Sequence, residues 1–156
     1  MTTASDSYEC IKVLLVEDGR GDVRLIEEAL RNSHPSVQLY VATNGEEAMA
    51  FLRRGASHAH APRPDLILLD LNLPKMDGRD VLANIKADIR LNTIPIIVLT
   101  ISDAPEDLEK CYQLHANCYL TKPSQLDEFE KLVMSINEFW LKNVKIPKLP
   151  QHAKSE

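Results

Sequence analysis

The sequence predicts an α/β fold, a doubly wound five-stranded parallel sheet with helices on both faces. Short, mainly apolar runs recur five times, as expected for the strands of a buried parallel sheet, and one of them, residues 37–41, alternates apolar and polar residues. Between them lie segments whose apolar residues are three or four positions apart, the spacing of amphipathic helices. Because strands and helices alternate along the chain, parallel pairing with helical crossovers is the expected arrangement.

The first half of the chain contains three of the expected strands and two helices. The run "IKVLLV" reads as a buried strand, and the helix after the second strand opens with Asn44, a residue type that caps helix N-termini. The expected strands are residues 11–16, 37–41 and 66–70, and the expected helices are residues 22–30 and 44–54.

The second half repeats the alternation. Asp77 and Gly78 form a helix start, and Pro105 lies in the first turn of a later helix that Ser102 or Asp103 is expected to cap. That helix has a predicted apolar face of Leu108, Cys111, Tyr112 and His115. The expected strands are residues 94–99 and 117–120, and the expected helices are residues 78–88, 105–115 and 125–141.

Five strands joined by right-handed crossovers leave few topologies, of which the flavodoxin-like order 2-1-3-4-5 is the natural one. No internal repeat and no second domain is visible in the sequence. We therefore expect one domain over residues 9–141, with an N-terminal tail of residues 1–8. Residues 142–156 are basic and contain proline, and we expect them to form a C-terminal tail too short to fold as an output domain.

Composition excludes several classes of protein. The net charge of -5 argues against a nucleic-acid-binding protein, which needs a basic surface. No apolar stretch approaches the roughly twenty residues of a membrane span, and the N-terminus lacks the pattern of a secretory signal. Three cysteines without paired spacing indicate reduced thiols, so we expect a cytoplasmic protein.

Carboxylates stand at the ends of two strands that the predicted order makes neighbours. Glu17 and Asp18 follow the first strand, and Asp70 follows the third. Two such charges about 4 Å apart repel by roughly 1 to 4 kcal/mol, so a cation is expected between them. Oxygen ligands on short loops suit Mg²⁺.

Two more strand ends bring polar groups to the same edge of the sheet. Thr100 ends the fourth strand, and Lys122 follows the fifth. A hydroxyl and an ammonium group beside a metal-bound carboxylate are able to hold the oxygens of a phosphoryl group. Asp70 would then be the nucleophile that attacks phosphorus and becomes an acyl phosphate.

These residues, in this order, resemble the receiver domains of two-component response regulators over about residues 9–141. The resemblance rests on Glu17 and Asp18, Asp70 in "LLDLNLPKMDG", Thr100 in "IPIIVLT" and Lys122 before a proline. The segment "VEDGRGDVRLIEEAL" and the final "EFWLKNVKIP" look most like single-domain regulators that partner bacterial and cyanobacterial phytochrome histidine kinases.

The resemblance implies a role for each site residue. Asp70 would accept a phosphoryl group from a kinase phosphohistidine. Asp18, Asp70 and the backbone carbonyl of Asn72 would bind Mg²⁺ directly, and Glu17 would act through water. Lys122 would pair with the acceptor.

The resemblance also implies a switch and an output. Thr100 would move toward the phosphate, and the aromatic side chain of Tyr119 would change rotamer with it. The chain would be a signalling protein that catalyses only its own phosphorylation and dephosphorylation, with a sensor histidine kinase as its partner. Output would pass by protein contact or by onward phosphoryl transfer.

The last helix has more apolar residues than one sheet face requires. Leu126, Phe129, Val133, Ile136 and Trp140 form one stripe, which Leu132 and Phe139 widen. One explanation is a broad core face with a C-terminal lid. The other is a homodimer through the side formed by the fourth helix, fifth strand and fifth helix, with an interface of Tyr112, Tyr119, Phe139 and Trp140.

Two other functions compete with the receiver. A Mg²⁺-dependent phosphatase forming an aspartyl-phosphate usually has an acid/base Asp two residues after the nucleophile, where this chain has Asn72. A flavodoxin-like cofactor binder needs a phosphate-binding loop after the first strand, where "EDGRGD" presents acids. Both fit the residues poorly.

Overall fold

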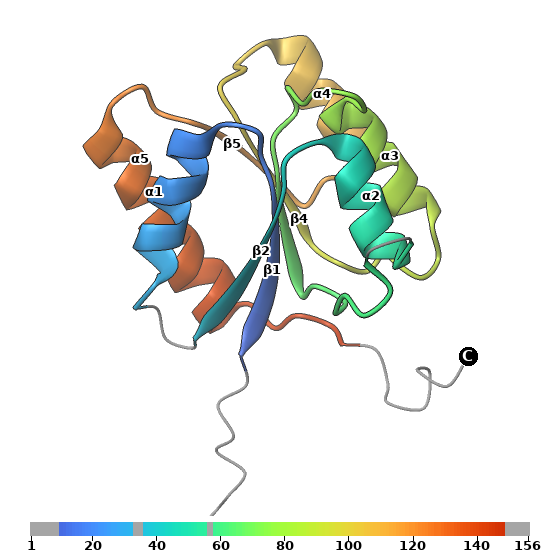
Figure 1. Cartoon of the computed structure of the whole chain (residues 1–156). Helices are drawn as coiled ribbons and strands as arrows, with labels where there is room; N and C mark the ends of the chain where they lie inside the picture. The colour runs from blue at the N-terminus through green and yellow to red at the C-terminus, as the bar shows by residue number, and fades with distance from the viewer. Residues whose placement is uncertain (1–9, 33–35, 56–57, 149–156) are drawn as a thin grey trace, which may run out of the picture.

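The computed structural model describes residues 10–32, 36–55 and 58–148, and it contains one five-stranded parallel sheet. The strand order β2-β1-β3-β4-β5 confirms the predicted topology. Helices cover both faces of the sheet (Figure 1). The elements are β1 (Ile11–Val16), α1 (Arg20–Leu30), β2 (Val37–Ala42), α2 (Gly45–Arg53), β3 (Leu66–Leu69), α3 (Gly78–Ala87), β4 (Ile96–Thr100), α4 (Pro105–Gln113), β5 (Cys118–Thr121), α5 (Leu126–Ile136) and the π-helix η2 (Asn137–Asn143).

Alternate residues of the central strands point to opposite faces of the sheet and enter two separate apolar clusters. On one face, side chains such as Leu14 and Leu69 pack with residues of α2, α3 and α4. On the other, Leu15 and Leu68 pack with residues of α1 and α5. Burial on both faces explains the unbroken apolar runs, because neither side of β3 or β4 meets water.

Side-chain caps start two of the helices, one at the predicted cap Asn44 and one at Asp77, where the sequence predicts a helix start. The Asn44 side chain accepts a hydrogen bond from the backbone N–H of Glu47 at 2.8 Å, and Asp77 accepts one from the N–H of Arg79 at the same distance. The expected cap of α4 was wrong. Ala104 is its N-cap residue and makes no side-chain bond, with Pro105 in the first turn.

Helix α4 is lightly packed, and its predicted apolar face was also wrong. Of the residues in α4, only Cys111 is buried. Leu108 is 42% exposed and Tyr112 is 50% exposed, and His115, just beyond the helix, is also exposed. Hydrophobic packing therefore contributes less to holding α4 than to holding the other helices.

The C-terminal helix changes its winding where the sequence predicts one continuous helix to Leu141. Helix α5 ends at Ile136, and η2 continues to Asn143. The π-helix leaves Phe139 53% exposed while Leu141 is buried. Leu126 is 72% exposed, so it does not belong to the core-facing stripe.

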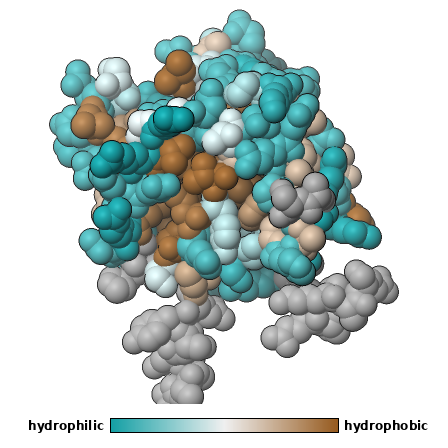
Figure 2. All heavy atoms as spheres, in the orientation of Figure 1, coloured by the Kyte–Doolittle hydropathy of each residue, from teal (hydrophilic) through white to brown (hydrophobic). Residues whose placement is uncertain are grey.

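One edge of the sheet leaves apolar side chains partly open to solvent. Figure 2 shows a brown strip between α1 and α2, over the edge strand β2. Val37, Leu39 and Val41 of this strand are only partly buried.

Among the described helices, none combines the length and the apolar character that crossing a membrane requires.

Candidate functional site

Three carboxylates meet where the carboxyl ends of β1 and β3 lie side by side. Val16 of β1 is in register with Leu69 of β3, so the acids that follow these strands share one edge. Glu17, Asp18 and Asp70 each offer an oxygen, and these oxygens all lie within 4.8 Å of one another. Glu17 and Asp70 are buried, and Asp18 is exposed. The convergence expected from strand order is present.

The backbone around Asp70 is tied to its neighbours on both sides. Its N–H donates to the carbonyl oxygen of Val16 at 3.0 Å, and the N–H of Gly78 donates to the carbonyl oxygen of Leu71 at 2.9 Å. The N–H of Asn72 donates to Asp70 Oδ1 at 3.3 Å. Asn72 itself is exposed, and its backbone carbonyl stays a predicted ligand.

Lys122 brings a positive charge into this acidic cluster. Its Nζ donates to Glu17 Oε2 at 2.5 Å, to Asp22 Oδ2 at 2.8 Å and to Asp70 Oδ2 at 3.1 Å. Its backbone N–H donates to the carbonyl oxygen of Thr100 at 2.7 Å. That bond fixes Lys122 beside the end of β4, and its ammonium group lies next to Asp70.

Burial and charge shift the pKa values of both partners in this pair. Desolvation raises the pKa of Glu17 to about 7, although the hydrogen bond from Lys122 lowers it. Desolvation also disfavours the charged form of Lys122, but its bonds to Asp22 and Glu17 outweigh this and raise its pKa above the ordinary value. Lys122 is therefore protonated at all physiological pH values.

Asp22 belongs to this group and was missed from the sequence. It lies in the first turn of α1, which begins two residues earlier than expected, at Arg20. An acid in the first turn of a helix is common, since it complements the helix dipole. The signal that could have identified Asp22 is its place at the same edge of the sheet as Glu17.

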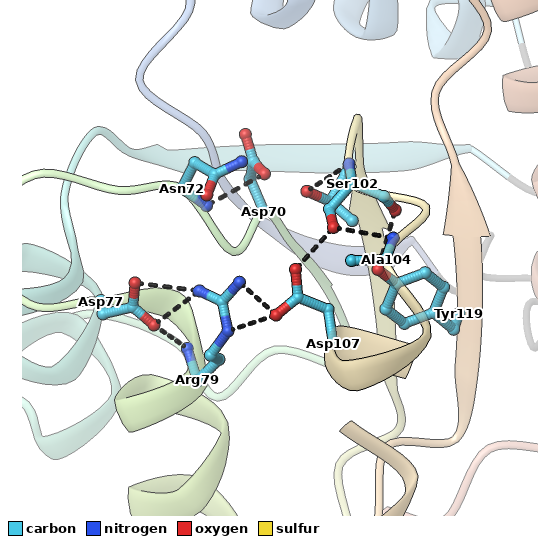
Figure 3. A network of polar contacts seen from close by, with 9 residues as sticks. Asp70, Asn72, Asp77, Arg79, Ser102, Ala104, Asp107 and Tyr119 are labelled. Atoms are coloured by element: carbon cyan, nitrogen blue, oxygen red, sulfur yellow. Dashed lines mark hydrogen bonds and ion pairs between the residues drawn. The ribbon is translucent and has the colours of Figure 1, made fainter. Parts of the chain in front are cut away.

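A second polar network links α3 to α4 and to the loop before α4 (Figure 3). Arg79 Nη2 donates to Asp107 Oδ1 at 2.5 Å, and Arg79 Nη1 donates to Asp77 Oδ2 at 3.1 Å. The Ser102 hydroxyl donates to Asp107 Oδ2 at 2.5 Å. The bonds from Ser102 and Arg79 hold the pKa of Asp107 below its ordinary value. This network is the polar attachment of α4, and residue spacing gave no sign of it.

The two expected switch residues, Thr100 and Tyr119, both contact this network. Thr100 is fully buried, and its hydroxyl accepts from the N–H of Ser102 at 3.4 Å. The Tyr119 hydroxyl donates to the carbonyl oxygen of Ser102 at 2.8 Å, as Figure 3 shows. Ser102 therefore stands between the two.

The residues expected at an interface are only partly free. Tyr112 and Phe139 are 50% and 53% exposed. Trp140 is partly buried against the core, with its ring edge-on to Phe139 at a centroid distance of 6.0 Å. Tyr119 has its hydroxyl occupied, as described above. Trp140 therefore packs as the lid alternative expects, and the homodimer alternative stays a prediction.

The acidic cluster has the donor chemistry of a divalent-cation site. Its ligand atoms are carboxylate oxygens, which hard cations such as Mg²⁺ prefer. Lys122 offsets part of the negative charge, but its single ammonium group is bonded to the three carboxylates of Glu17, Asp22 and Asp70, and Asp18 lies close to two of them. The residues present therefore fit a divalent metal.

The chain belongs to the family of response regulator receiver domains, whose model matches residues 13–134. It is 48% identical over 135 residues to the response regulator Rcp1 of Synechocystis, covering 86% of this chain and 92% of that protein. It is 37% identical over 129 residues to a probable methanogenesis regulatory protein, FilR2, of Methanothrix harundinacea, covering 83% of each.

Solved structures agree with this assignment. The phosphorylated cyanobacterial phytochrome response regulator RcpA matches with a TM-score of 0.87 and 49% identity, over 89% of this chain and 99% of that one. The Mn²⁺-bound form of Rcp1 matches with a TM-score of 0.87 and 47% identity, over 88% and 99%. These likenesses favour a signalling protein over the phosphatase and the cofactor binder.

Proposed function

We propose that the chain accepts a phosphoryl group on Asp70 from a sensor histidine kinase, and that this kinase is a phytochrome. The observation that carries the proposal is the buried Asp70 carboxylate with the Lys122 ammonium group 3.1 Å away. The phytochrome assignment is supported by the similarity to RcpA, a cyanobacterial phytochrome response regulator.

The proposed reaction transfers phosphorus from nitrogen to oxygen. An Asp70 oxygen attacks the phosphorus atom, the P–N bond of the kinase phosphohistidine breaks, and the imidazole nitrogen keeps the electron pair. Lys122 and the Thr100 hydroxyl donate hydrogen bonds to the phosphoryl oxygens. Hydrolysis of the acyl phosphate by water later restores the Asp70 carboxylate and releases inorganic phosphate.

Mg²⁺ would be held by Asp18, Asp70 and the Asn72 carbonyl, with Glu17 acting through water. When bound, the metal neutralises charge on the phosphoryl oxygens during transfer. Its binding would also relieve the repulsion among the carboxylates, since their oxygens lie within 4.8 Å of one another. The metal-bound relative Rcp1 supports a divalent metal here.

The signal would leave the site through Ser102. When Thr100 moves toward the phosphate, its hydrogen bond with the Ser102 N–H changes, and the Tyr119 and Asp107 partners of Ser102 are disturbed with it. Helix α4 then shifts, and the side formed by α4, β5 and α5 contacts a second copy or a downstream protein.

The test is the intact mass of the protein after incubation with acetyl phosphate, with and without Mg²⁺, beside Asp70→Asn. We expect one phosphoryl group to be gained only with Mg²⁺ and only in the unaltered chain. A phytochrome kinase autophosphorylated with ATP should label the same residue. Labelling that persists in Asp70→Asn would refute the proposed acceptor.

A further inference from the structure

The sheet ends on one side at β2, whose outer edge has no hydrogen-bonding partner among the described residues. β2 pairs with β1 alone. The carbonyl oxygens of Ser36 and Ala42 accept backbone hydrogen bonds from β1 and from the residue that follows it, so the even-numbered residues face β1. Because the backbone groups of a strand alternate between its two edges, the N–H and C=O groups of Val37, Leu39 and Val41 point outward.

The sequence of β2 does not protect this edge. Edge strands of soluble proteins are usually guarded by a charged residue, a proline or a bulge, which discourages pairing with another strand. β2 has no charged residue and no proline, and its register with β1 is unbroken. The side chains of Val37, Leu39 and Val41 are only partly buried, and Figure 2 shows apolar surface over this strand. The edge therefore combines free backbone groups with apolar area.

A groove of about 330 Å³ lies between this edge and α1, with Val23 and Val41 in its lining. Its charged lining residues form an ordered series along the chain. Their signs read minus, plus, plus, minus, minus, plus, for Asp18, Arg20, Arg24, Glu27, Glu28 and Arg31. Read in the opposite direction, the series has the opposite sign at every position. Such a series is complementary to itself when two copies lie antiparallel across a two-fold axis.

We infer that the β2 edge is an interface between two copies of this chain, paired antiparallel about a two-fold axis at Leu39. In this register Leu39 lies opposite itself, and Val37 lies opposite Val41 of the second copy. Opposite residues of a hydrogen-bonded antiparallel pair exchange both backbone bonds, so every outward N–H and C=O group of these residues gains a partner. The partly buried apolar side chains also meet their counterparts.

The same axis brings the two charge series together. It is perpendicular to the sheet, so α1 of both copies lies on one face, and the two helices run in opposite directions. With the series aligned end to end, Arg24 faces Glu27 of the second copy, and Asp18 faces Arg31. In a parallel arrangement each charge would instead face its own sign, which is unfavourable. Charge therefore selects the antiparallel pair.

This interface is separate from phosphorylation. It does not include Asp70, and β2 and β5 are the opposite edges of the sheet, so the side formed by α4, β5 and α5 stays free. Strand pairing with one flanking helix is a small interface, and we expect a weak, concentration-dependent complex.

The experiment is disulfide trapping of Leu39→Cys at high protein concentration, without a phosphodonor. The partly buried Cys10 and Cys118 are first replaced by serine. Opposite residues of a hydrogen-bonded antiparallel pair have Cα atoms about 5.5 Å apart, which is within the range that a disulfide spans. Mild oxidation should therefore convert Leu39→Cys into a covalent dimer.

Gln38→Cys is the matched control, because Gln38 is exposed on the same strand but would lie diagonally across from its counterpart. The two Cα atoms would be about 7 to 8 Å apart, too far for a disulfide without backbone movement. Leu39→Cys should form the dimer about tenfold faster or more. Equal rates would overturn the inference. So would a Leu39→Cys chain that stays monomeric, which would leave the edge to a strand of another protein.

Charge reversal tests the same register without altering the strand. Arg24→Glu and Glu27→Arg each place like charges opposite one another, so each should weaken self-association by about two- to tenfold. Both changes together restore opposite charges and should restore the pairing. Arg24 and Glu27 are exposed, so the monomer should keep its melting temperature. Sedimentation equilibrium measures the association.

A double variant that associates more weakly than either single variant would overturn the register, as would an unaltered chain that sediments only as a monomer at the concentration used for trapping. These outcomes are separate from the proposed function, because every variant keeps Asp70 and no phosphodonor is present.

Discussion

Glu17 is the residue at which burial and charge oppose each other most strongly. Its side chain is 4% exposed, with Lys122 Nζ 2.5 Å away. Desolvation nevertheless raises its pKa from 4.5 to about 7. The folded state therefore binds the Glu17 proton more tightly than the unfolded chain does.

This difference predicts a pH dependence of stability without metal. A raised carboxyl pKa contributes stability below pH 4.5 that is lost as pH rises to about 7. The free energy of unfolding of the unaltered chain, relative to Glu17→Gln, should fall by about 1 to 3 kcal/mol across this window. Urea unfolding in EDTA at several pH values measures it.

Glu27→Gln serves as the control, because Glu27 is exposed on α1 and should show a constant difference from the unaltered chain. If the difference for Glu17→Gln stays flat or grows with pH, Lys122 dominates and the raised pKa is wrong.

Gly78 allows α3 to begin close to the backbone of Asp70 and Leu71, directly after β3. A Cβ atom at this position would lie 2.2 Å from the carbonyl oxygen of Asp70 and 2.5 Å from Leu71 Cα. Both are backbone atoms, so no side chain is able to move aside. Gly78→Ala should destabilise the fold by about 2 kcal/mol or more and displace Asp70.

The comparison for Gly78→Ala is Gly21→Ala, because a Cβ at Gly21 would meet no atom within 4 Å apart from its chain neighbours and the backbone of its own helix. That variant should be neutral or slightly stabilising, since alanine is the better helix former. Urea midpoints at constant slope measure both. Equal stability of the two variants would show that the loop after Asp70 yields to the added methyl group.

At the level of elements, the sequence was informative wherever packing or a cap determined the structure. β1 has the predicted bounds. Helix α2 begins after its expected cap, Asn44, and α3 begins at Gly78, where a helix start was expected. It failed at η2, because apolar spacing does not distinguish a π turn from an α turn. The sequence also failed for α4, because its apolar spacing predicts a buried face, whereas Leu108 and Tyr112 are exposed.

Helix α4 should depend on its polar attachment because it buries so little. Arg79 and Asp107 are 27% and 20% exposed in their ion pair, so the pair is partly shielded from solvent. Asp107→Asn should cost about 1 kcal/mol of stability and speed amide exchange over residues 102–115. Hydrogen exchange read by mass spectrometry tests this locally.

Glu28→Gln is the matched control, because Glu28 also forms a carboxylate–arginine ion pair, with Arg24. In that pair the side chains of Glu28 and Arg24 are 55% and 81% exposed. It should leave exchange in α4 unchanged. Protection of α4 that survives Asp107→Asn would mean that Cys111 alone holds the helix.

For the whole molecule, the sequence predicted which residues at the strand ends lie together better than it predicted the polar contacts around them. Glu17, Asp18, Asp70 and Lys122 were placed together because parallel strands deliver their ends to one edge. The contact between Asp22 and Lys122 depends on the angle at which α1 leaves that edge of the sheet. The Arg79–Asp107 pair joins residues 28 positions apart, and no periodicity encodes such a pairing.

Whether two copies of the chain form a dimer depends on exposed side chains and not on the core. Phe139 is 53% exposed beside Trp140, and the expected interface on the side of α4, β5 and α5 includes it. We expect phosphorylation to favour a dimer there, because the movement of Ser102 repositions α4 against this surface. Phe139→Glu should weaken that dimer by about tenfold or more, as burying an unpaired charge at an interface does.

Analytical ultracentrifugation with and without beryllofluoride and Mg²⁺ measures the effect. The matched control is Ile89→Glu, because Ile89 is 87% exposed in the turn after α3 and lies outside the proposed surface. Phe139→Glu should keep the melting temperature of the unaltered monomer, since the side chain is half exposed. A dimer that is equally stable in both variants would place the contact elsewhere, and a protein that stays monomeric when phosphorylated would refute the dimer altogether.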